Sequence, residues 1–412
     1  MAPAPPRQRG APAAAIGGAR RVAGLDVVRA CAILLVMVSH FSDVFAALWA
    51  ARPPAFVSLA GVFGVELFFV LSGFLIGTLL ARAAASAPGW RGWRVFMLRR
   101  WLRTLPLYVA WIAIMAASWP PADGRVGWHL LRYLSLTQNL AWRMPADNWF
   151  GVSWSLAIEE WFYLLFSLPL LLLARRDGGR RSMPALAALF IAVPVLVRCL
   201  LPAGLDFGQA VYKVAAYRLD SIAYGVAAAL VATRRPAVLR HWAGLLAAGL
   251  GVVAFVWVQI AGAGVALPGL FYRALFLPLL SAGFCLCLPA ALRLERAPRW
   301  VERPAFWLST RSYGLYVVHL TVLEVASGAV FVHGWPKRYA ILLALVAAPL
   351  LAELSWRLLE RPMLALRPPQ PGGAPALTVP GTAPTALVGP EGRAFEAMTI
   401  GEARDVRRAH SG

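Results

Sequence analysis

The first long apolar segment of the chain carries two residues that can do chemistry, Arg29 and His40. They are eleven residues apart, which on a helix is about 20° past three full turns, so both lie on one face, with Asp26 one turn before Arg29. The helix rise separates them by about 16 Å and puts His40 beyond the middle of a bilayer. An imidazole there can act as a general base near neutral pH. A histidine that only bridges two helices is the alternative.

A basic segment precedes the third apolar run and ends with Arg100 and Arg103, three residues apart. We expect both on one face, at the cytoplasmic entrance of the helix that follows. Planar guanidinium groups bind phosphate through paired donors, so the pair is a candidate phosphate site. Ordinary anchoring by positive charge is the competing interpretation.

The fourth apolar run begins with a polar stripe, in which Ser155, Glu159 and Tyr163 follow one another at intervals of four. Such spacing aligns them along one helix face. Glu159 and its neighbour Glu160 are close to the predicted outer boundary. They are expected to bind a hydroxyl-bearing substrate or to hold a histidine or arginine. An ion pair within the bundle is the alternative.

Three more ionisable residues interrupt later apolar runs: Arg218, Asp220 and His319. Ionisable groups at bilayer depth are expensive and therefore indicate function by default. Arg218 and Asp220 can equally form ion pairs with a neighbouring helix. Two small residues, Gly73 and Gly77, are spaced to let another helix approach closely.

The composition indicates a membrane protein. Hydrophobic residues make up 60% of the 412 positions, charged residues 14%, and the mean hydropathy is +0.65, against about 45–50% and about 25% in soluble domains. About 20 apolar residues span a bilayer. Runs of that kind predict an all-α bundle of about ten transmembrane helices, at Val27–Leu48, Ala60–Leu80, Leu105–Trp119, Val152–Leu173, Pro184–Leu201, Val211–Ala232, Trp242–Ala261, Leu270–Leu292, Phe306–Ala326 and Tyr339–Leu359. The third run is short, and the basic segment before it can extend it.

The net charge of +21 reflects topology and not nucleic-acid binding. With the N-terminus in the cytoplasm, seventeen arginines fall in the four inner loops and six basic residues in the five outer loops. This is the positive-inside asymmetry of membrane proteins. It predicts that both termini are cytoplasmic, in a multi-pass protein of the bacterial inner membrane.

The chain divides into one membrane domain, residues 22–364, between two Pro/Gly/Ala-rich tracts without periodicity. These tracts, residues 1–21 and 365–412, are predicted to be a disordered leader and tail in the cytoplasm. The first apolar run is longer than a signal-peptide core and is expected to be retained. The four cysteines show neither a disulfide framework nor a metal-ligand spacing. No metal site and no resident cofactor are expected.

These residues, taken in order, resemble the acyltransferase 3 family from about residue 24 to residue 362. The resemblance comprises Arg-x10-His at Arg29 and His40, FFVLSGFLIG at Phe68–Gly77, Arg-x-x-Arg at Arg100 and Arg103, WSLAIEE at Trp154–Glu160, RLDSIAYG at Arg218–Gly225, SYGLYVVH at Ser312–His319 and ERP at Glu360–Pro362. Each motif is weak alone, but seven in order on a ten-span chain are a strong signal.

The resemblance implies transfer of an acyl group, usually acetyl, from cytoplasmic acyl-CoA to a hydroxyl on the outer side of the membrane. By this resemblance His40 would be catalytic and Arg29 would support it, while Arg100 and Arg103 would bind the CoA. We also expect Glu159 of the polar stripe to be catalytic. Contacts with substrate are expected from Ser155, Tyr163, Arg218, Asp220 and His319. Many relatives carry a histidine where this chain has Val152. No C-terminal esterase-like domain follows, so a stand-alone transfer mechanism is expected.

The acceptor is expected to be an extracytoplasmic glycan or lipid-linked saccharide, such as O-antigen or exopolysaccharide. An exported small molecule such as a macrolide is the alternative. The outer segment Pro120–Phe150 mixes tryptophans with amides, which fits either a carbohydrate surface or an interfacial aromatic belt. A transporter or flippase is the main rival from another class, and a polyprenyl-phosphate glycosyltransferase is a rival enzyme. A transporter usually shows inverted repeats, and this sequence has none that we can detect. A glycosyltransferase of that kind would favour an acidic pair in the first outer loop, and residues 49–60 contain no carboxylate. The sequence does not indicate an oligomeric state.

Overall fold

The computed structural model describes residues 22–121, 123–145, 148–202, 204–263 and 269–369, together with the short segments 376–377 and 385–386. The regular secondary structure of these residues is helical apart from one antiparallel pair of two-residue strands, β1 (Ala376–Leu377) and β2 (Thr385–Ala386). The predicted leader, residues 1–21, and most of the predicted tail, residues 365–412, lie outside the described residues.

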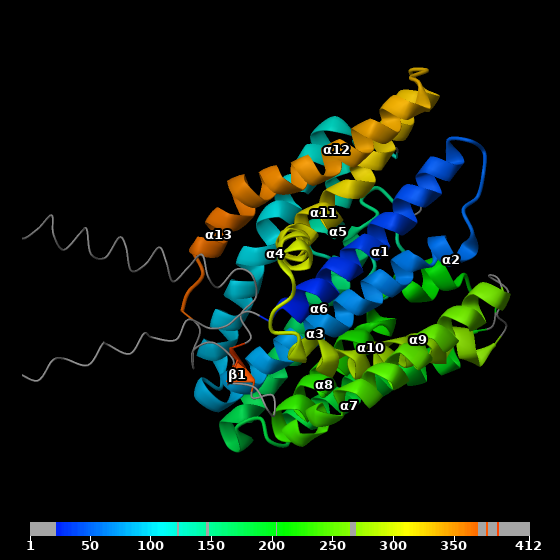
Figure 1. The fold of residues 1–412 in the computed structure, drawn as a ribbon. Helices are drawn as coiled ribbons and strands as arrows, with labels where there is room; N and C mark the ends of the chain where they lie inside the picture. The colour runs from blue at the N-terminus through cyan, green and yellow to red at the C-terminus, as the bar shows by residue number, and fades with distance from the viewer. Residues whose placement is uncertain are drawn as a thin grey trace, which may run out of the picture.

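The helices follow one another along the chain as Figure 1 shows. In order they are α1 (Ala23–Ala47), α2 (Ala55–Ser58), α3 (Ala60–Ser86), α4 (Trp90–Ser118), α5 (Val126–Leu134), α6 (Ser153–Asp177), α7 (Ser182–Leu200), η1 (Gly208–Tyr212), η2 (Ala215–Tyr217), α8 (Leu219–Arg234), η3 (Pro236–His241), α9 (Trp242–Ala263), η5 (Phe271–Leu275), α10 (Phe276–Arg293), α11 (Arg299–Phe331), α12 (Lys337–Ser355), η6 (Trp356–Glu360) and α13 (Arg361–Ala365).

Nine helical segments within the described part of the chain are long and apolar enough to cross a membrane. They confirm the prediction of an all-α membrane bundle and match nine of the ten predicted runs. The third of these helices, α4, begins at Trp90, so the basic segment that precedes the short apolar run is itself helical. Arg100 and Arg103 therefore lie inside a helix and not in a loop at its entrance.

The tenth predicted run, Val211–Ala232, corresponds to α8, which has 16 residues and begins only at Leu219. The prediction that this helix starts at Val211 is wrong because the preceding backbone is tied elsewhere. The amides of Ala215 and Ala216 donate to the carbonyls of Asn139 and Leu140, at 2.8 and 2.9 Å. These bonds hold the segment in short π and 3₁₀ turns against the loop that follows α5.

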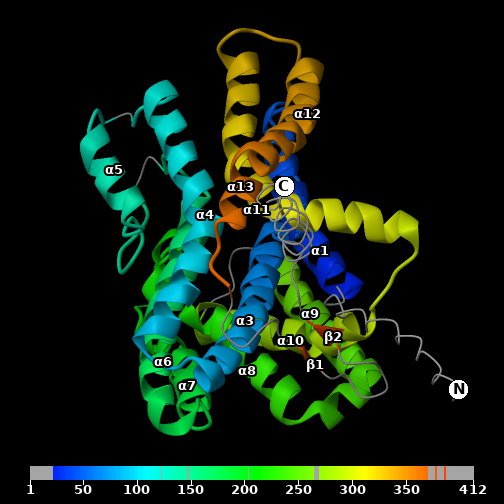
Figure 2. The same cartoon turned by 90° about the vertical axis from the view of Figure 1, so that its left-hand side faces the viewer.

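The outer surface of the bundle is apolar. Exposed large side chains along α12 include Leu342, Leu345, Val346 and Leu350, and α9 carries a similar band. Apolar patches of this size are rare on soluble proteins and are typical of a surface that faces lipid. Figure 1 shows α12 and α9 on opposite sides of the bundle, where both are open to the surroundings. Figure 2, the view turned by 90°, shows α5 standing beside α4.

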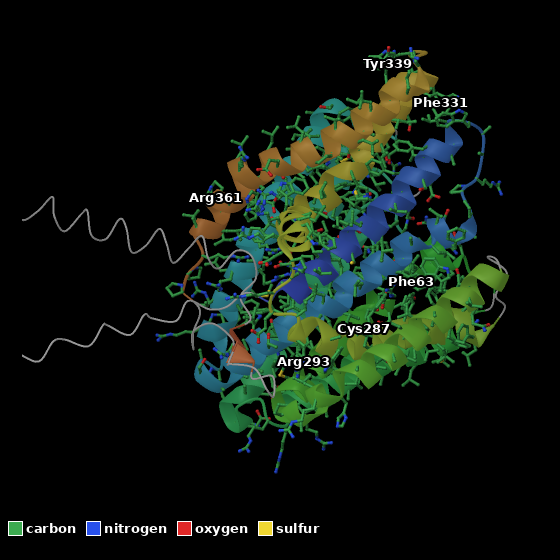
Figure 3. The ribbon with its side chains drawn as sticks, viewed as in Figure 1. Phe63, Cys287, Arg293, Phe331, Tyr339 and Arg361 are labelled. Atoms are coloured by element: carbon green, nitrogen blue, oxygen red, sulfur yellow. The ribbon has the colours of Figure 1, made fainter. Side chains whose placement is uncertain are left out.

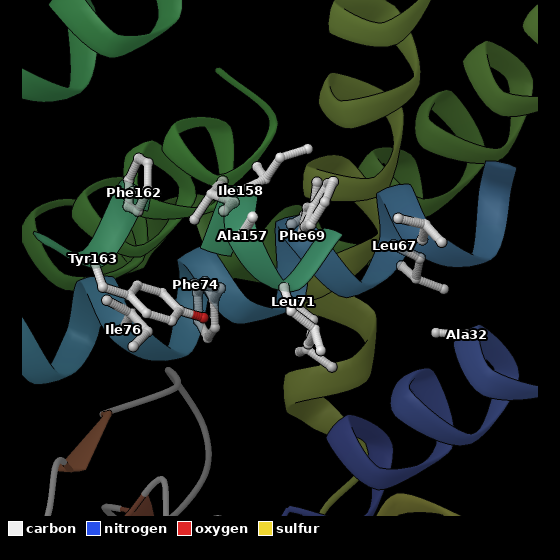
Figure 4. Packing of buried hydrophobic residues seen from close by; sticks show 14 of the residues in the cluster. Ala32, Leu67, Phe69, Leu71, Phe74, Ile76, Ala157, Ile158, Phe162 and Tyr163 are labelled. Atoms are coloured by element: carbon white, nitrogen blue, oxygen red, sulfur yellow. The ribbon is translucent and has the colours of Figure 1, made fainter. Parts of the chain in front are cut away.

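Helix α3 lies in the middle of the bundle and contacts α1, α6, α8 and α10. Its contact with α8 is backbone to backbone, because a Cβ added at Gly73 would lie 1.9 Å from the carbonyl oxygen of Ile222. This confirms that the small residues on α3 permit close helix approach. Figure 4 shows apolar side chains of α3 and α6 in one cluster, with Phe69 near Ala157 and the Tyr163 ring directed toward α3.

The two ends of the bundle are marked by labelled residues in Figure 3. Arg293 and Arg361 lie toward one end, which we name the Arg361 end, and Phe331 and Tyr339 lie toward the other, the Phe331 end. Helix α1 begins at the Arg361 end, where the Gly24 amide donates to the carbonyl of Leu294.

Candidate active site

His40 and His319 form a direct hydrogen bond between α1 and α11. Nδ1 of His40 lies 2.8 Å from Nε2 of His319. The ring planes differ by 9° and the ring centres are 5.0 Å apart, so the two imidazoles meet edge to edge in nearly one plane. His319 is fully buried and His40 is partly exposed. The pair thus has one enclosed member and one that a substrate can reach.

The partners of His319 fix which nitrogen carries each proton. Nδ1 of His319 lies 2.8 Å from the carbonyl oxygen of Tyr316 and 3.0 Å from that of Leu315. A carbonyl only accepts, so this Nδ1 must carry hydrogen, and Nε2 of a neutral His319 is then an acceptor. It follows that His40 donates through Nδ1 and keeps a lone pair on Nε2. Among the described residues, this Nε2 has no hydrogen-bond partner.

Beside His40 on the Phe331 side is a small polar group from α1 and α2. Ser58 donates its hydroxyl to Oδ1 of Asp43 at 2.6 Å, and Ser39 donates to the carbonyl of Ser58, also at 2.6 Å. Asp43 lies three residues after His40, so the two share a helix face. Gly61 lets α3 approach α1 closely at this point, since a Cβ there would lie 2.8 Å from Ser39 Oγ.

Ser155 is linked to the histidine pair through Tyr316. The hydroxyls of Ser155 and Tyr316 are 2.6 Å apart, and the Tyr316 ring lies 5.8 Å from that of His319. Tyr316 therefore makes two contacts: its hydroxyl bonds to Ser155 of α6, and its backbone carbonyl accepts a hydrogen bond from His319. The structure brings Ser155 to the site that the sequence analysis assigned to it, although through a tyrosine that the sequence analysis did not name.

Tyr163 is the centre of a second polar cluster, one turn beyond Glu159 on α6. Its hydroxyl donates to Oε2 of Glu159 at 2.9 Å, accepts from Arg100 at 2.8 Å and lies 2.6 Å from the Ser72 hydroxyl. The Arg100 guanidinium also stacks over the Tyr163 ring at 4.4 Å. Arg100 and Glu159 are 17% and 18% exposed. A cation and an anion thus keep accessible surface between α4 and α6.

Arg29 lies on the same face of α1 as His40, because both contact α11. Arg29 donates to the Ser309 hydroxyl at 3.5 Å, and Ser309 donates to Asp26 at 2.7 Å. The prediction that Asp26, Arg29 and His40 form one stripe is confirmed. Arg29 also interacts electrostatically with Arg100 and with Glu159. The stripe therefore runs from the Arg100 cluster toward the histidine pair.

Arg103 belongs to the same cationic group, since its electrostatic neighbours include Arg29, Arg100 and Glu360. Arg99, one residue before Arg100, donates to the carbonyl of Pro368 after α13. Several guanidinium groups are therefore concentrated where α4 passes the start of α1 and the end of α13. This arrangement suits an anion with more than one phosphate.

Arg218 and Asp220 are placed apart from the histidines, in a fully buried network. Arg218 pairs with Glu66 of α3 at 2.5 Å, and Asp220 pairs with Arg198 of α7 at 2.5 Å. All four side chains have no exposed surface. The two residues thus form ion pairs with neighbouring helices, which is one of the two roles that the sequence allows.

Sequence reasoning did not single out Asp43, Ser72 and Tyr316, nor Lys213, whose charge acts on His40. Lys213 could have been found from the sequence, because an ionisable residue within the predicted apolar run Val211–Ala232 indicates function. Asp43 could also have been found, because its spacing of three from His40 puts both residues on one helix face. Ser72 and Tyr316 are ordinary in apolar helices, and only the packing of α3, α6 and α11 reveals their contacts.

Comparison with known proteins agrees with the geometry. A family profile described as an acyltransferase domain matches residues 22–354. YrhL of Bacillus subtilis, named as a candidate peptidoglycan O-acetyltransferase, is 29% identical over 370 residues, which cover 84% of this chain and 55% of YrhL. OatA of Listeria monocytogenes, named a peptidoglycan O-acetyltransferase, is 24% identical over 365 residues, 83% of this chain and 56% of OatA. OatA of Staphylococcus aureus, named an O-acetyltransferase, is 23% identical over 366 residues, 84% and 57% of the two chains.

This chain spans about half the length of the curated relatives that it matches. No solved structure matches it. The profile covers more than half of the chain and includes the histidine pair as well as the arginine group. The chain therefore belongs to the acyltransferase 3 family.

Proposed function

We propose that this protein is a membrane O-acyltransferase that moves an acyl group, in the first instance acetyl, from cytoplasmic acyl-CoA to a hydroxyl of an extracytoplasmic glycan. The observation that carries the proposal is the histidine pair, in which His40 Nε2 keeps a free lone pair at membrane depth. Family membership supports acyl transfer. The names of the OatA relatives support O-acetylation and, for the Listeria protein, peptidoglycan as acceptor.

The donor site in this proposal is the arginine group at the Arg361 end, which is the cytoplasmic end by the positive-inside asymmetry. Arg100 and Arg103 bind the phosphates of CoA, and a guanidinium pair suits them better than two ammonium groups would. The long, thin pantetheine arm then leads the thioester along the stripe of α1 toward His40. The proposal assigns the protein to the cytoplasmic membrane of a bacterium, which the bacterial relatives support.

The acceptor hydroxyl approaches from the Phe331 end and meets His40. In a direct transfer, His40 Nε2 removes the hydroxyl proton while the oxygen attacks the thioester carbonyl. The new C–O bond forms, the C–S bond breaks, and the proton passes from His40 to the departing thiolate, so CoA leaves as a thiol. His319 accepts the hydrogen bond from His40 Nδ1 and stabilises the charge that develops on the imidazolium.

A covalent route uses the same atoms in two steps. His40 Nε2 attacks the thioester, the C–S bond breaks and CoA leaves as a thiolate, so an acyl-imidazolium remains on His40. The acceptor hydroxyl then takes the acyl group and gives its proton to the thiolate, which restores neutral His40. The His40–His319 bond supports both routes, because each needs Nε2 as the nucleophilic or basic nitrogen. The routes differ in whether a labelled enzyme forms when acceptor is withheld.

The experiment that tests the proposal uses the full chain in proteoliposomes, with radiolabelled acetyl-CoA and peptidoglycan fragments as acceptor. The expected result is label on the glycan as an alkali-labile ester, with none when His40→Ala replaces the wild type. A correctly inserted wild-type protein that labels neither the glycan nor any exported small molecule would contradict the proposal. Uptake of label without ester formation would instead support a transporter.

A further inference from the structure

Lys213 is close enough to His40 for its charge to act on the imidazole, and it lies in a segment that the proposed mechanism does not use. Its carbonyl accepts from Asn139 Nδ2 at 2.5 Å, and the same amide donates to the carbonyl of Trp154 at 3.0 Å. Asn139 therefore fixes the Lys213 backbone next to the first turn of α6, where Ser155 joins Tyr316 and the histidine pair. Lys213 is also one of the two charged residues that interact electrostatically with His40.

The other charged residue near His40 is Asp43, which already accepts a hydrogen bond from Ser58. Lys213 differs, because no hydrogen bond or ion pair joins its ammonium to any of the described residues, although the side chain is partly buried. Asp206 is the charged residue that acts on the Lys213 ammonium. Burial lowers the pKa of Lys213, and Asp206 opposes that shift. This is the behaviour of a cation that has lost water without gaining a partner.

Lysine is rare in this protein, which has 40 basic residues but only two lysines, Lys213 and Lys337. Lys337 lies over the ring of Trp49 at 5.0 Å, at the start of α12. An ammonium is a compact point charge on a flexible stem, suited to an anion whose orientation varies. A partly desolvated cation of this kind gains most from an anion that arrives with the substrate.

We propose that Lys213 binds an anionic group of the acceptor, a carboxylate or a phosphate next to the hydroxyl that His40 acylates. This inference rests on the proposed function and deepens it, because it assigns the acceptor to the class of acidic glycans. In that arrangement His40 lies between two recognition elements. Lys213 holds the anion, and the remaining oxygen of Asp43 accepts a hydrogen bond from a sugar hydroxyl.

The test compares three tetrasaccharide acceptors with acetyl-CoA and the reconstituted full chain. One is neutral chitotetraose, one alternates N-acetylglucosamine with N-acetylmuramic acid and so carries lactyl carboxylates, and one is chitotetraose with a phosphate at the reducing end. We expect kcat/KM to favour a charged acceptor, and the preferred arm identifies carboxylate or phosphate. Lys213→Met should reduce that preference about tenfold or more, mainly through KM, as for the loss of one hydrogen bond to a charged group.

Lys337→Met is the matched control, since it removes the only other lysine and should leave the preference unchanged. Lys213→Arg should retain part of it, because the charge is kept. Equal kcat/KM for all three acceptors would overturn the inference while leaving acyl transfer intact. So would a loss in Lys213→Met that is the same for neutral and charged acceptors, because that result would place Lys213 at the reacting carbonyl. Absence of transfer to any acceptor would count against the proposed function.

A binding measurement that does not depend on turnover uses the scarcity of lysine. In the Lys337→Met variant, Lys213 is the only lysine that an amine-reactive reagent can modify, and peptide mass spectrometry gives its rate of modification. The charged tetrasaccharide that is preferred in turnover should slow this rate, and neutral chitotetraose should not. Equal rates with both, at concentrations that saturate transfer, would contradict the assignment.

Discussion

Nδ1 of His40 lies 2.8 Å from Nε2 of His319, although the two residues are 279 positions apart in the chain. The Tyr316 carbonyl holds the far side of His319 at 2.8 Å. These two bonds together determine the tautomer of both rings and leave a lone pair on Nε2 of His40. The catalytic role proposed for His40 therefore depends on a residue that another helix supplies.

Replacing His40 with alanine should abolish detectable acyl transfer, because loss of a general base alone typically lowers the rate by about 10² to 10⁴. His40→Gln should be nearly as poor, since an amide cannot take up a proton usefully at neutral pH. The measurement is label transferred from acetyl-CoA by membranes that contain equal amounts of each protein. Near-wild-type transfer by a correctly inserted His40→Ala protein would remove His40 from the mechanism.

Replacing His319 should lower kcat and leave the KM for acetyl-CoA nearly unchanged, because His319 acts through His40 and not on the donor. We expect a loss of about 10²-fold or more in His319→Phe, as when a catalytic histidine loses its orienting partner. His319→Gln should be milder, since its amide can still accept from His40. Equal activity of the Phe variant and the wild type would contradict the orienting role.

Replacing Arg100 and Arg103 together with alanine should raise the KM for acetyl-CoA about tenfold or more, because charge-assisted bonds to phosphate are lost. Arg103→Lys should also weaken donor binding, since a point charge replaces a two-pronged donor. Arg91→Ala, which removes an exposed arginine from the first turn of the same helix, is the control. Unchanged donor affinity in the double variant would refute the assignment.

Replacing Gly73 with alanine should destabilise the bundle by about 1–3 kcal/mol or more, because the new methyl group overlaps the Ile222 carbonyl. Gly251→Ala is a matched change in α9, where nothing lies within 4 Å of the added Cβ. Thermal unfolding in detergent should show a lower midpoint for the first variant and little change for the second. Equal midpoints would mean that α3 and α8 do not pack as closely as described.

Reporter fusions test the topology that the donor and acceptor sites require. A fusion after Arg181 should report the cytoplasm, and a fusion in the segment between α4 and α6 should report the outside, as the arginine asymmetry predicts. A signal from the same compartment for both fusions would exclude the proposed arrangement. It would also remove the argument that CoA enters at the Arg361 end.

The sequence by itself determined the helices and the stripe on α1. Apolar runs of about 20 residues can only be satisfied by helices in a bilayer, because every backbone group must be paired internally. The fixed helical repeat then puts Arg29 and His40 on one face whatever surrounds them. The structure confirms both, since Arg29 and His40 each reach α11.

Only the tertiary structure decided which residues those faces meet. The sequence offered the Glu159–Tyr163 stripe and Arg100 as separate features, and helix packing joined them into one cluster. In the same way, Arg218 pairs with Glu66, which is 152 positions away in the chain. Hydrogen bonds to the loop after α5 hold the residues before Leu219, so α8 begins only at Leu219. A local repeat sets the direction of a side chain around its own helix axis. The partner of that side chain depends on the order and spacing of the helices in the bundle, and no local repeat specifies these.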